Sequence, residues 1–260
     1  MSGLYDSHCH LDLPELVDSW QLYWQQAQSV GVQRCLIPAV APEYWPNLLH
    51  WRQQQPQFRI ALGIHPWWAA RQSFAVIELL AQQLQQHGAL ISAVGEIGLD
   101  FAIDSNTFSQ QQQLFSAQLA LAKRFDKPLI LHHRKSMVQL LAELKQQQFS
   151  QGGILHAFSG SPEQGREFVK LGFKLGIGGT ITYERSGKTQ QAVRQLPLSA
   201  FVLETDAPAM PLAGFQGQVN TPAQLRRVFA AFCQLRPEPP TDIARQLWCN
   251  TVQVLGDEMQ

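Results

Sequence analysis

The chain opens with an apolar run that ends on two histidines, Gly3-Leu4-Tyr5-Asp6-Ser7-His8-Cys9-His10. A short apolar run of this kind is typical of a buried strand. Residues two apart on an extended backbone face the same side, so the imidazoles of His8 and His10 can bind one cation. Histidine pairs at this spacing also occur as surface or packed residues, so the motif alone does not decide its role.

The same pattern recurs along the chain. Apolar runs predict eight strands, at residues 4–8, 34–38, 58–63, 90–96, 128–132, 153–156, 173–178 and 201–206. Six of these runs end on candidate metal ligands, which are His8 with His10, His65, Glu96, His132 with His133, His156, and Glu204 with Asp206. Of the eight histidines, only His50 and His87 lie elsewhere. The pattern predicts a slightly irregular (β/α)8 barrel with its chemistry at the carboxyl ends of the strands.

The segments between these runs carry helix signals. Thr107 with Gln110, and Ser161 with Gln164, each predict a capping box at the start of a helix. No linker or internal repeat divides the chain, so we expect one domain over residues 1–260. The Pro- and Gly-rich segment 207–220 follows the last predicted strand, and we expect it to form a wall of the substrate site.

Composition limits the classes of function. The chain has 20 Lys and Arg against 20 Asp and Glu, and this zero net charge argues against a tight duplex-DNA binder. The four cysteines form no C-x-x-C pair, and no leader or membrane-spanning run is recognisable. We therefore expect a cytoplasmic protein without a membrane or an obligate protein partner. Cys9 lies between two histidines and points away from both, which favours a packed thiol over a metal ligand.

The ligand set indicates more than one metal ion. Six nitrogen and oxygen ligands are too many for one zinc ion, but they suit two divalent cations that share a bridging carboxylate. Imidazoles with carboxylates favour Zn²⁺ or Mn²⁺, whereas Mg²⁺ prefers more oxygen ligands.

Six stretches together resemble one family, the TatD metal-dependent deoxyribonucleases within the wider amidohydrolase-like barrels. The stretches occur in the family's order and span nearly the whole chain: Asp6–His10, Gly63-Ile64-His65-Pro66, Gly95–Asp100, Pro128–Arg134, Gly153–Gly160 and Leu203–Pro208. The tract Gly178–Tyr183 is similar to a subgroup that includes a poorly characterised enterobacterial hydrolase.

The resemblance implies a role for each ligand. His8 and His10 would hold one metal ion, and Glu96 would bridge to a second ion held by His132 and His156. Asp206 would complete the first site and orient or deprotonate the attacking water, while His65 would face the scissile phosphate as a donor or acid. The family motif places the ligand at His132, which leaves His133 as a supporting or packed residue.

Four further residues are expected to support the site or contact substrate. Arg134 would bind phosphate or pair with Glu204 or Asp100, and Asp100 would orient a histidine or cap a helix. Glu204 is expected to support a ligand. Trp67 would either stack a base or pack against the protein.

The C-terminal loop departs from the family pattern. Asn220 and Pro222 are retained, but the acidic residue and the preceding arginine of the family motif are missing. This weakens any transfer of phosphate contacts to this loop.

These features predict a two-metal phosphodiesterase that acts on DNA, with single-stranded ends as substrate and attack from the 3′ end. The main alternative is a small-molecule hydrolase of the amidohydrolase type that cleaves an ester, lactone or amide with the same metal ions. Many such enzymes carry a modified lysine at the bridging strand, where this chain has Glu96. A non-catalytic metal-binding scaffold is a third alternative.

Overall fold

Eight parallel strands lie side by side in chain order in the computed structural model, which describes residues 3–256. They are β1 (Leu4–Asp6), β2 (Val32–Pro38), β3 (Phe58–Leu62), β4 (Ile91–Asp100), β5 (Leu129–Arg134), β6 (Gly153–Leu155), β7 (Phe173–Ile177) and β8 (Phe201–Leu203). The Ser7 amide donates to the Leu203 carbonyl (2.9 Å), which joins the first strand to the last. The sheet is therefore a nearly closed barrel, and the predicted (β/α)8 fold is confirmed.

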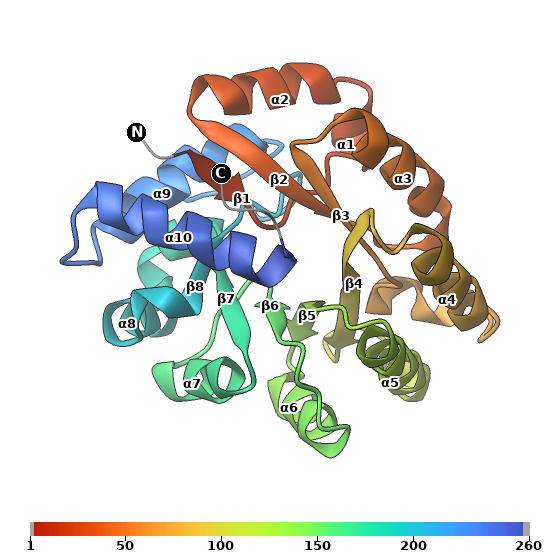
Figure 1. Cartoon of the computed structure of the whole chain (residues 1–260). Coiled ribbons are helices and arrows are strands. Elements are labelled where there is room, and N and C mark those ends of the chain that lie inside the picture. The colour runs from red at the N-terminus through yellow and green to blue at the C-terminus, as the bar shows by residue number, and fades with distance from the viewer. Residues whose placement is uncertain (1–2, 257–260) are drawn as a thin grey trace.

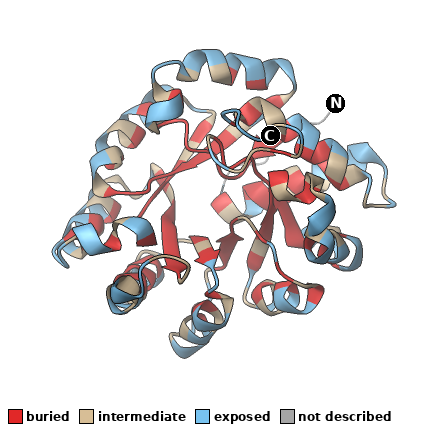
Figure 2. Ribbon diagram, turned by 180° about the vertical axis from the view of Figure 1, so that it is seen from behind, coloured by how far each residue is buried: buried red, intermediate tan, exposed pale blue. Residues whose placement is uncertain are grey.

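Helices surround the strands as an outer ring (Figure 1). They are α1 (Pro14–Val17), α2 (Trp20–Ser29), α3 (Trp45–Gln54), α4 (Val76–His87), α5 (Phe108–Arg124), α6 (Met137–Gln146), α7 (Pro162–Lys170), α8 (Gly187–Gln195), α9 (Leu225–Cys233) and α10 (Pro240–Leu255). Their inner faces and the strands bury one large apolar core, while their outer faces are exposed (Figure 2). Among the helices of residues 3–256, none combines the length and apolar character that crossing a bilayer requires.

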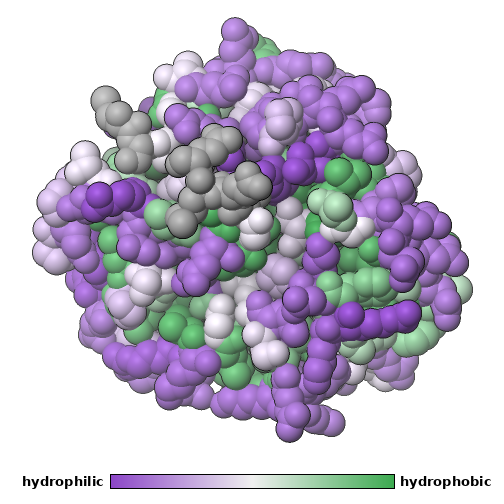
Figure 3. Space-filling model, viewed as in Figure 1, coloured by the Kyte–Doolittle hydropathy of each residue, from purple (hydrophilic) through white to green (hydrophobic). Residues whose placement is uncertain are grey.

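The last helix closes one end of the barrel. Side chains from seven strands fill the barrel interior and pack against Val252 and Leu255 of α10. The ring of Trp248 lies 5.4 Å from that of Tyr5. In Figure 1, α10 crosses the barrel opening, and on the same face Figure 3 shows mainly hydrophilic residues around the rim. Because this end is plugged, the opposite end, where the strands finish, is left to form a site.

Each predicted strand overlaps an observed one; β8 ends at Leu203 rather than at Asp206, and the largest difference is at β4. This strand was expected to end at Glu96, but it continues to Asp100 and pairs with β5 as far as Arg134. Glu96 therefore lies within β4 rather than at its end, and its amide donates to the Ala39 carbonyl (2.9 Å). The one-domain prediction also covers residues 1–2 and 257–260, which lie outside the described residues.

The two predicted capping boxes have different outcomes. At Ser161 the box is present, because the hydroxyl accepts from the Gln164 amide and the Gln164 side chain accepts from the Ser161 amide. At Thr107 the prediction is wrong, since this hydroxyl donates to the Asp104 carbonyl (2.6 Å) and accepts from the Gln111 side chain (2.9 Å). The Thr107 hydroxyl therefore bonds to Asp104 and Gln111 instead of accepting from a backbone amide of the first turn of α5.

Candidate metal centre

The ligand residues predicted from the sequence converge at the carboxyl ends of the strands. Glu96 lies in β4 and His132 in β5, and the other ligand residues follow β1, β3, β6 and β8. A cavity of about 470 Å³ opens over them. Its lining includes His10, His65, Glu96, His132, His156 and Asp206.

One cluster gathers at the first and last strands. The Nε2 atoms of His8 and His10 are 3.0 Å apart, and they lie 3.2 and 3.4 Å from Glu96 Oε2. Asp206 Oδ1 lies 3.7 Å from His8 Nε2 and 3.6 Å from His10 Nε2. Ligands about 2.0–2.1 Å from a tetrahedral cation are about 3.3 Å apart. The four atoms therefore suit one divalent cation.

A second cluster uses the other oxygen of the same carboxylate. Glu96 Oε1 lies 3.1 Å from His132 Nδ1, 3.5 Å from His65 Nε2 and 3.9 Å from His156 Nε2. Glu96 thus presents one oxygen to each cluster, which is the arrangement of a carboxylate that bridges two cations.

The outer nitrogens of three histidines face oxygen acceptors. His10 Nδ1 lies 3.1 Å from the Pro38 carbonyl, His132 Nε2 lies 3.4 Å from Asp100 Oδ2, and His156 Nδ1 lies 2.9 Å from Glu204 Oε1. Each acceptor favours a proton on the outer nitrogen, so the inner nitrogen presents a lone pair to the centre. These tautomers are inferred from the hydrogen-bond network. Neutral imidazoles oriented in this way are the form that binds a cation, so the donor set fits divalent metals.

His65 has the opposite orientation. The Trp67 amide donates to His65 Nδ1 (3.1 Å), so in the neutral ring the proton lies on Nε2, which faces the centre. Burial and the neighbouring His132 hold the pKa of His65 well below its usual range, which keeps the ring neutral. His65 is thus arranged as a hydrogen-bond donor toward the cavity rather than as a ligand.

Positive charge stabilises the carboxylates of the centre, as the pKa shifts of its residues indicate. Burial alone would raise the pKa of Glu96, but the surrounding histidines outweigh it and hold the pKa well below its usual range. Burial disfavours the charged form of His156, yet Glu204 and Asp206 raise its pKa to about 10. Burial raises the pKa of Asp206 to about 6, although His156 and His10 act in the opposite direction. Bound cations would replace these protons.

Glu204 and Asp100 lie behind His156 and His132, respectively, and their supporting role stays a prediction. Glu204 Oε1 also accepts from the Ala157 amide (2.6 Å), and a Cβ on Gly176 would lie 2.1 Å from Glu204 Oε2, so this glycine leaves room for the carboxylate. Asp100 accepts from the Ala102 amide (2.9 Å). It therefore both faces a histidine and caps the turn that follows.

Trp67 and Arg134 both contact Asp100. The Trp67 indole donates to Asp100 Oδ2 (2.6 Å), while the residue remains 51% exposed at the cavity. Arg134 Nη1 lies 3.8 Å from the same oxygen, with its side chain 57% exposed. The Asp100 carboxylate is buried, but Arg134 is exposed and lines the cavity, so its guanidinium can also contact a molecule bound there.

Asp6 joins the two chain segments that carry the first cluster. Its Oδ1 accepts from the amides of His8 (3.3 Å) and Thr205 (3.0 Å), and the Thr205 hydroxyl donates to Oδ2 (2.6 Å). Burial raises the pKa of Asp6 to about 8 despite these hydrogen bonds. The sequence marked Asp6 only as part of a motif, and its contact with Thr205 could not be found from local pattern.

Cys9, Cys35 and His133 are buried beside the ligand residues. Asp6, Cys9 and Cys35 have side-chain atoms within 4.8 Å of one another, but both cysteines are fully buried, and burial raises the pKa of each thiol. The packed thiol predicted for Cys9 agrees with this position. Burial lowers the pKa of His133 to about 3; the residue lines the cavity but belongs to none of the candidate ligand groups of residues 3–256.

The segment 207–220 forms part of the wall, as expected. Pro208, Ala209 and Met210 line the cavity. Asn220 holds this segment in place, because its side-chain amide donates to the carbonyls of Thr205 and Ala209 (both 2.8 Å). Ser159 and Thr180 also line the cavity and were not singled out from the sequence.

Comparison with known proteins assigns the family. The family model described as TatD related DNase matches residues 5–256. The chain belongs to the TatD family. It is 44% identical over 246 residues to the uncharacterized metal-dependent hydrolase YjjV of Escherichia coli K12, which covers 95% of each chain. It is 38% identical to an uncharacterized metal-dependent hydrolase of Haemophilus influenzae, covering 97% of this chain and 99% of the relative.

A solved structure supports the same assignment. The crystal structure of YjjV, described as a TatD homologue, superposes with a TM-score of 0.94 at 42% identity and 98% coverage of both chains. A TatD-family hydrolase of Entamoeba histolytica shares the fold, with a TM-score of 0.83, 17% identity and 98% coverage of both chains. The predicted family is therefore confirmed, and so is its similarity to an enterobacterial hydrolase.

Proposed function

We propose that this TatD-family metal-dependent hydrolase is a phosphodiesterase that uses two divalent cations and degrades DNA from single-stranded 3′ ends. The observation that carries the proposal is the placement of Glu96, whose two oxygens face two separate sets of histidines. Two-cation sites with a shared carboxylate suit phosphodiester hydrolysis, because charge develops on both the attacking and the leaving oxygen.

The ligands would divide between two positions. His8, His10 and Asp206 would hold one cation, His132 and His156 would hold the other, and Glu96 would contact both. Bound cations would lower the pKa of a water molecule and stabilise negative charge on the phosphate. The mixture of imidazoles and carboxylates favours Zn²⁺ or Mn²⁺ over Mg²⁺.

Two side chains would handle protons and hydrogen bonds during hydrolysis. Asp206 would orient the attacking water and accept its proton. His65 would donate a hydrogen bond from Nε2 to a phosphate oxygen, because its Nδ1 is occupied by the Trp67 amide. Each role requires only groups that already line the cavity.

The cavity also offers contacts to nucleotides. Trp67 presents an exposed aromatic face on which a base can stack, and Arg134 has an exposed cation for phosphate. With no net charge to attract a duplex, a substrate gripped locally at one strand end fits the protein best. We further propose that it acts in the cytoplasm and without an obligate protein partner.

The test is metal-dependent cleavage of single-stranded oligonucleotides labelled at either end. Chelated protein should be inactive, and added Zn²⁺ or Mn²⁺ should restore a ladder that shortens from the 3′ end. His132→Ala should abolish it, whereas His50→Ala, an exposed histidine on α3, should not.

Cleavage of a lactone, carboxylic ester or amide, with every phosphodiester left intact, would overturn the proposal and favour the small-molecule alternative. Unchanged activity in Glu96→Ala and Asp206→Ala variants would show that the centre is not catalytic.

A further inference from the structure

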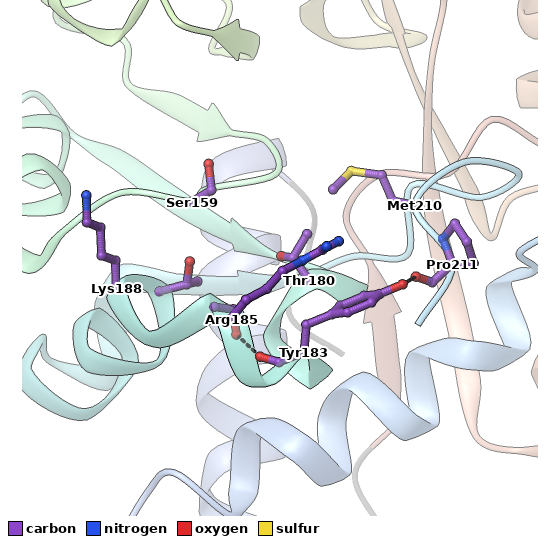
Figure 4. A pocket seen from close by; sticks show the side chains of 9 residues that line it. Ser159, Thr180, Tyr183, Arg185, Lys188, Met210 and Pro211 are labelled. Carbon is purple, nitrogen blue, oxygen red and sulfur yellow. Dashed lines mark hydrogen bonds between the residues drawn. The ribbon is translucent and has the colours of Figure 1, made fainter. Parts of the chain in front are cut away.

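A second cavity, of about 550 Å³ (Figure 4), shares part of its lining with the cavity over the metal centre. Ser159, Thr180 and Met210 line both cavities, so the two cavities are neighbours. These residues follow β6, β7 and β8, respectively. A molecule bound at the metal centre can therefore extend into the second cavity without leaving the protein surface.

Two cations line this second cavity, which we call the cationic cavity. Arg185 lies in the short helical turn η5 (Glu184–Ser186), and Lys188 lies in the first turn of α8. Both residues are exposed, and within residues 3–256 neither takes part in an ion pair.

The wall that carries Arg185 is held in place before any ligand binds. The Arg185 guanidinium lies 4.9 Å from the centre of the Tyr183 ring. The Tyr183 hydroxyl donates to the Pro211 carbonyl (2.7 Å), and the Ser186 hydroxyl donates to the Tyr183 carbonyl (2.6 Å). Figure 4 shows these contacts on the Arg185 side of the cavity. A fixed wall reduces the entropy lost when a ligand binds.

The positive charges of Arg185 and Lys188 are not neutralised by carboxylates in the described lining of the cavity. No carboxylate of residues 3–256 belongs to its lining, and Glu184, although next in sequence to Arg185, is not among the lining residues. Ser159 and Thr180, which carry hydroxyls, line both this cavity and the cavity over the metal centre. Cations with neighbouring hydroxyls form a binding surface for an anion that carries several oxygen acceptors. In (β/α)8 barrels, the loops after strands seven and eight frequently bind phosphate.

We propose that the cationic cavity binds a second phosphate group of the substrate, one that is not cleaved and that belongs to a neighbouring nucleotide of the same strand. The inference rests on the proposed phosphodiesterase function and specifies its substrate class. The metal centre would hold the scissile phosphate while Arg185 and Lys188 hold another, so the protein would prefer an oligonucleotide to a compound with a single phosphodiester.

The first test measures binding without turnover. Chelated protein is titrated into 5′-fluorescein-labelled tetrathymidylate, and fluorescence anisotropy reports the dissociation constant at several salt concentrations. Arg185→Gln and Lys188→Gln should each weaken binding about three- to tenfold. Each should also reduce the slope of log K against log salt by about 0.7, the value for one phosphate contact on a single strand.

Arg194 provides a matched control, because it lies on α8 together with Lys188. Arg194 of α8 is exposed but does not line the cavity, so Arg194→Gln should bind tetrathymidylate like the unaltered protein. Thermal unfolding of all three variants checks that they fold. If Arg185→Gln and Lys188→Gln retained the affinity and salt slope of the unaltered protein, or if Arg194→Gln lost as much, the cationic cavity would not be a phosphate site.

The second test separates this inference from the proposed function. With metal restored, the unaltered protein is compared on thymidylyl-thymidine, which has one phosphodiester, and on tetrathymidylate. The Arg185 and Lys188 variants should raise KM for the tetramer about three- to tenfold, with kcat and all thymidylyl-thymidine constants unchanged.

Failure of the unaltered protein to cleave either compound would reject the phosphodiesterase, while the anisotropy result would still decide whether the cavity binds phosphate. Normal cleavage, with equal KM values in all variants, would reject the cavity alone.

Discussion

The metal centre and the cationic cavity lie side by side, but they hold their charges in different ways. In the centre, the Glu96 and Asp206 carboxyl groups are buried and lie beside imidazoles, His8 among them. In the cavity, Arg185 and Lys188 are exposed and have no ion pair within residues 3–256. A buried charge depends on its neighbours, whereas an exposed cation acts nearly independently. Changes in the centre should therefore alter metal binding and chemistry, and changes in the cavity should alter substrate length preference only.

Asp206→Asn should have the largest effect, because it removes the proposed base and one ligand while preserving shape. We expect kcat to fall about 10²- to 10⁴-fold on thymidylyl-thymidine and on tetrathymidylate alike. Steady-state kinetics on both substrates, with metal content measured in parallel, would check this. A loss confined to the tetramer would break the comparison between the two regions.

Glu204→Gln should have the next largest effect, since it removes the charge that orients His156. Metal affinity should fall about 10- to 100-fold, as measured by titration calorimetry of the chelated protein. Gly176→Ala tests the same carboxylate without a charge change, because the new Cβ would lie 2.1 Å from Glu204 Oε2 and displace it. Ordinary metal affinity in both variants would show that Glu204 does not support the centre.

Trp67→Phe should have a smaller effect, because it removes the indole N–H that donates to Asp100. Burial opposes ionisation of Asp100, but hydrogen bonds from His132 and Trp67 hold its pKa below the usual range. Loss of one donor should lower kcat/KM about three- to tenfold. In Trp68→Phe, an indole is removed from the same cavity while the hydrogen bond to Asp100 stays. An equal loss in both variants would indicate aromatic packing instead.

Asp6→Asn should change the pH dependence of stability and leave substrate length preference unaltered. Burial raises the pKa of Asp6 from 3.8 to about 8. Between these two pH values, Asp6 therefore keeps its proton in the folded, chelated protein and has lost it in the unfolded chain. The contribution of protonated Asp6 to the free energy of unfolding is fully present below about pH 4 and is lost as the pH rises through about 8. The unaltered protein should therefore lose stability relative to Asp6→Asn over that window.

Urea denaturation of both proteins at several pH values, in chelator, gives the difference in unfolding free energy. A difference that does not change with pH would show that Asp6 is ionised when folded.

Much of the barrel follows from local sequence. All eight strands are close to their predicted positions, because a buried parallel strand needs a short apolar run and each run is punctuated by polar residues. Where an acceptor competes locally, pattern fails, as at Thr107, whose hydroxyl binds Asp104 and Gln111 instead of capping α5. The end of β4 was also missed, because residues 97–100 pair with β5 and strand pairing is not encoded in one segment.

Local pattern was enough to predict which side chains stand at the strand ends, since alternation along a strand and the order of strands in a barrel are local and topological rules. How those side chains face one another depends on the folded barrel. The two directions of the Glu96 oxygens, the acceptors behind His10, His132 and His156, and the room that Gly176 leaves for Glu204 all join residues far apart in the chain. The cationic cavity likewise exists because loops after β6, β7 and β8 meet at one end of the barrel. Contacts between distant residues depend on packing, and packing is fixed only when the whole barrel closes.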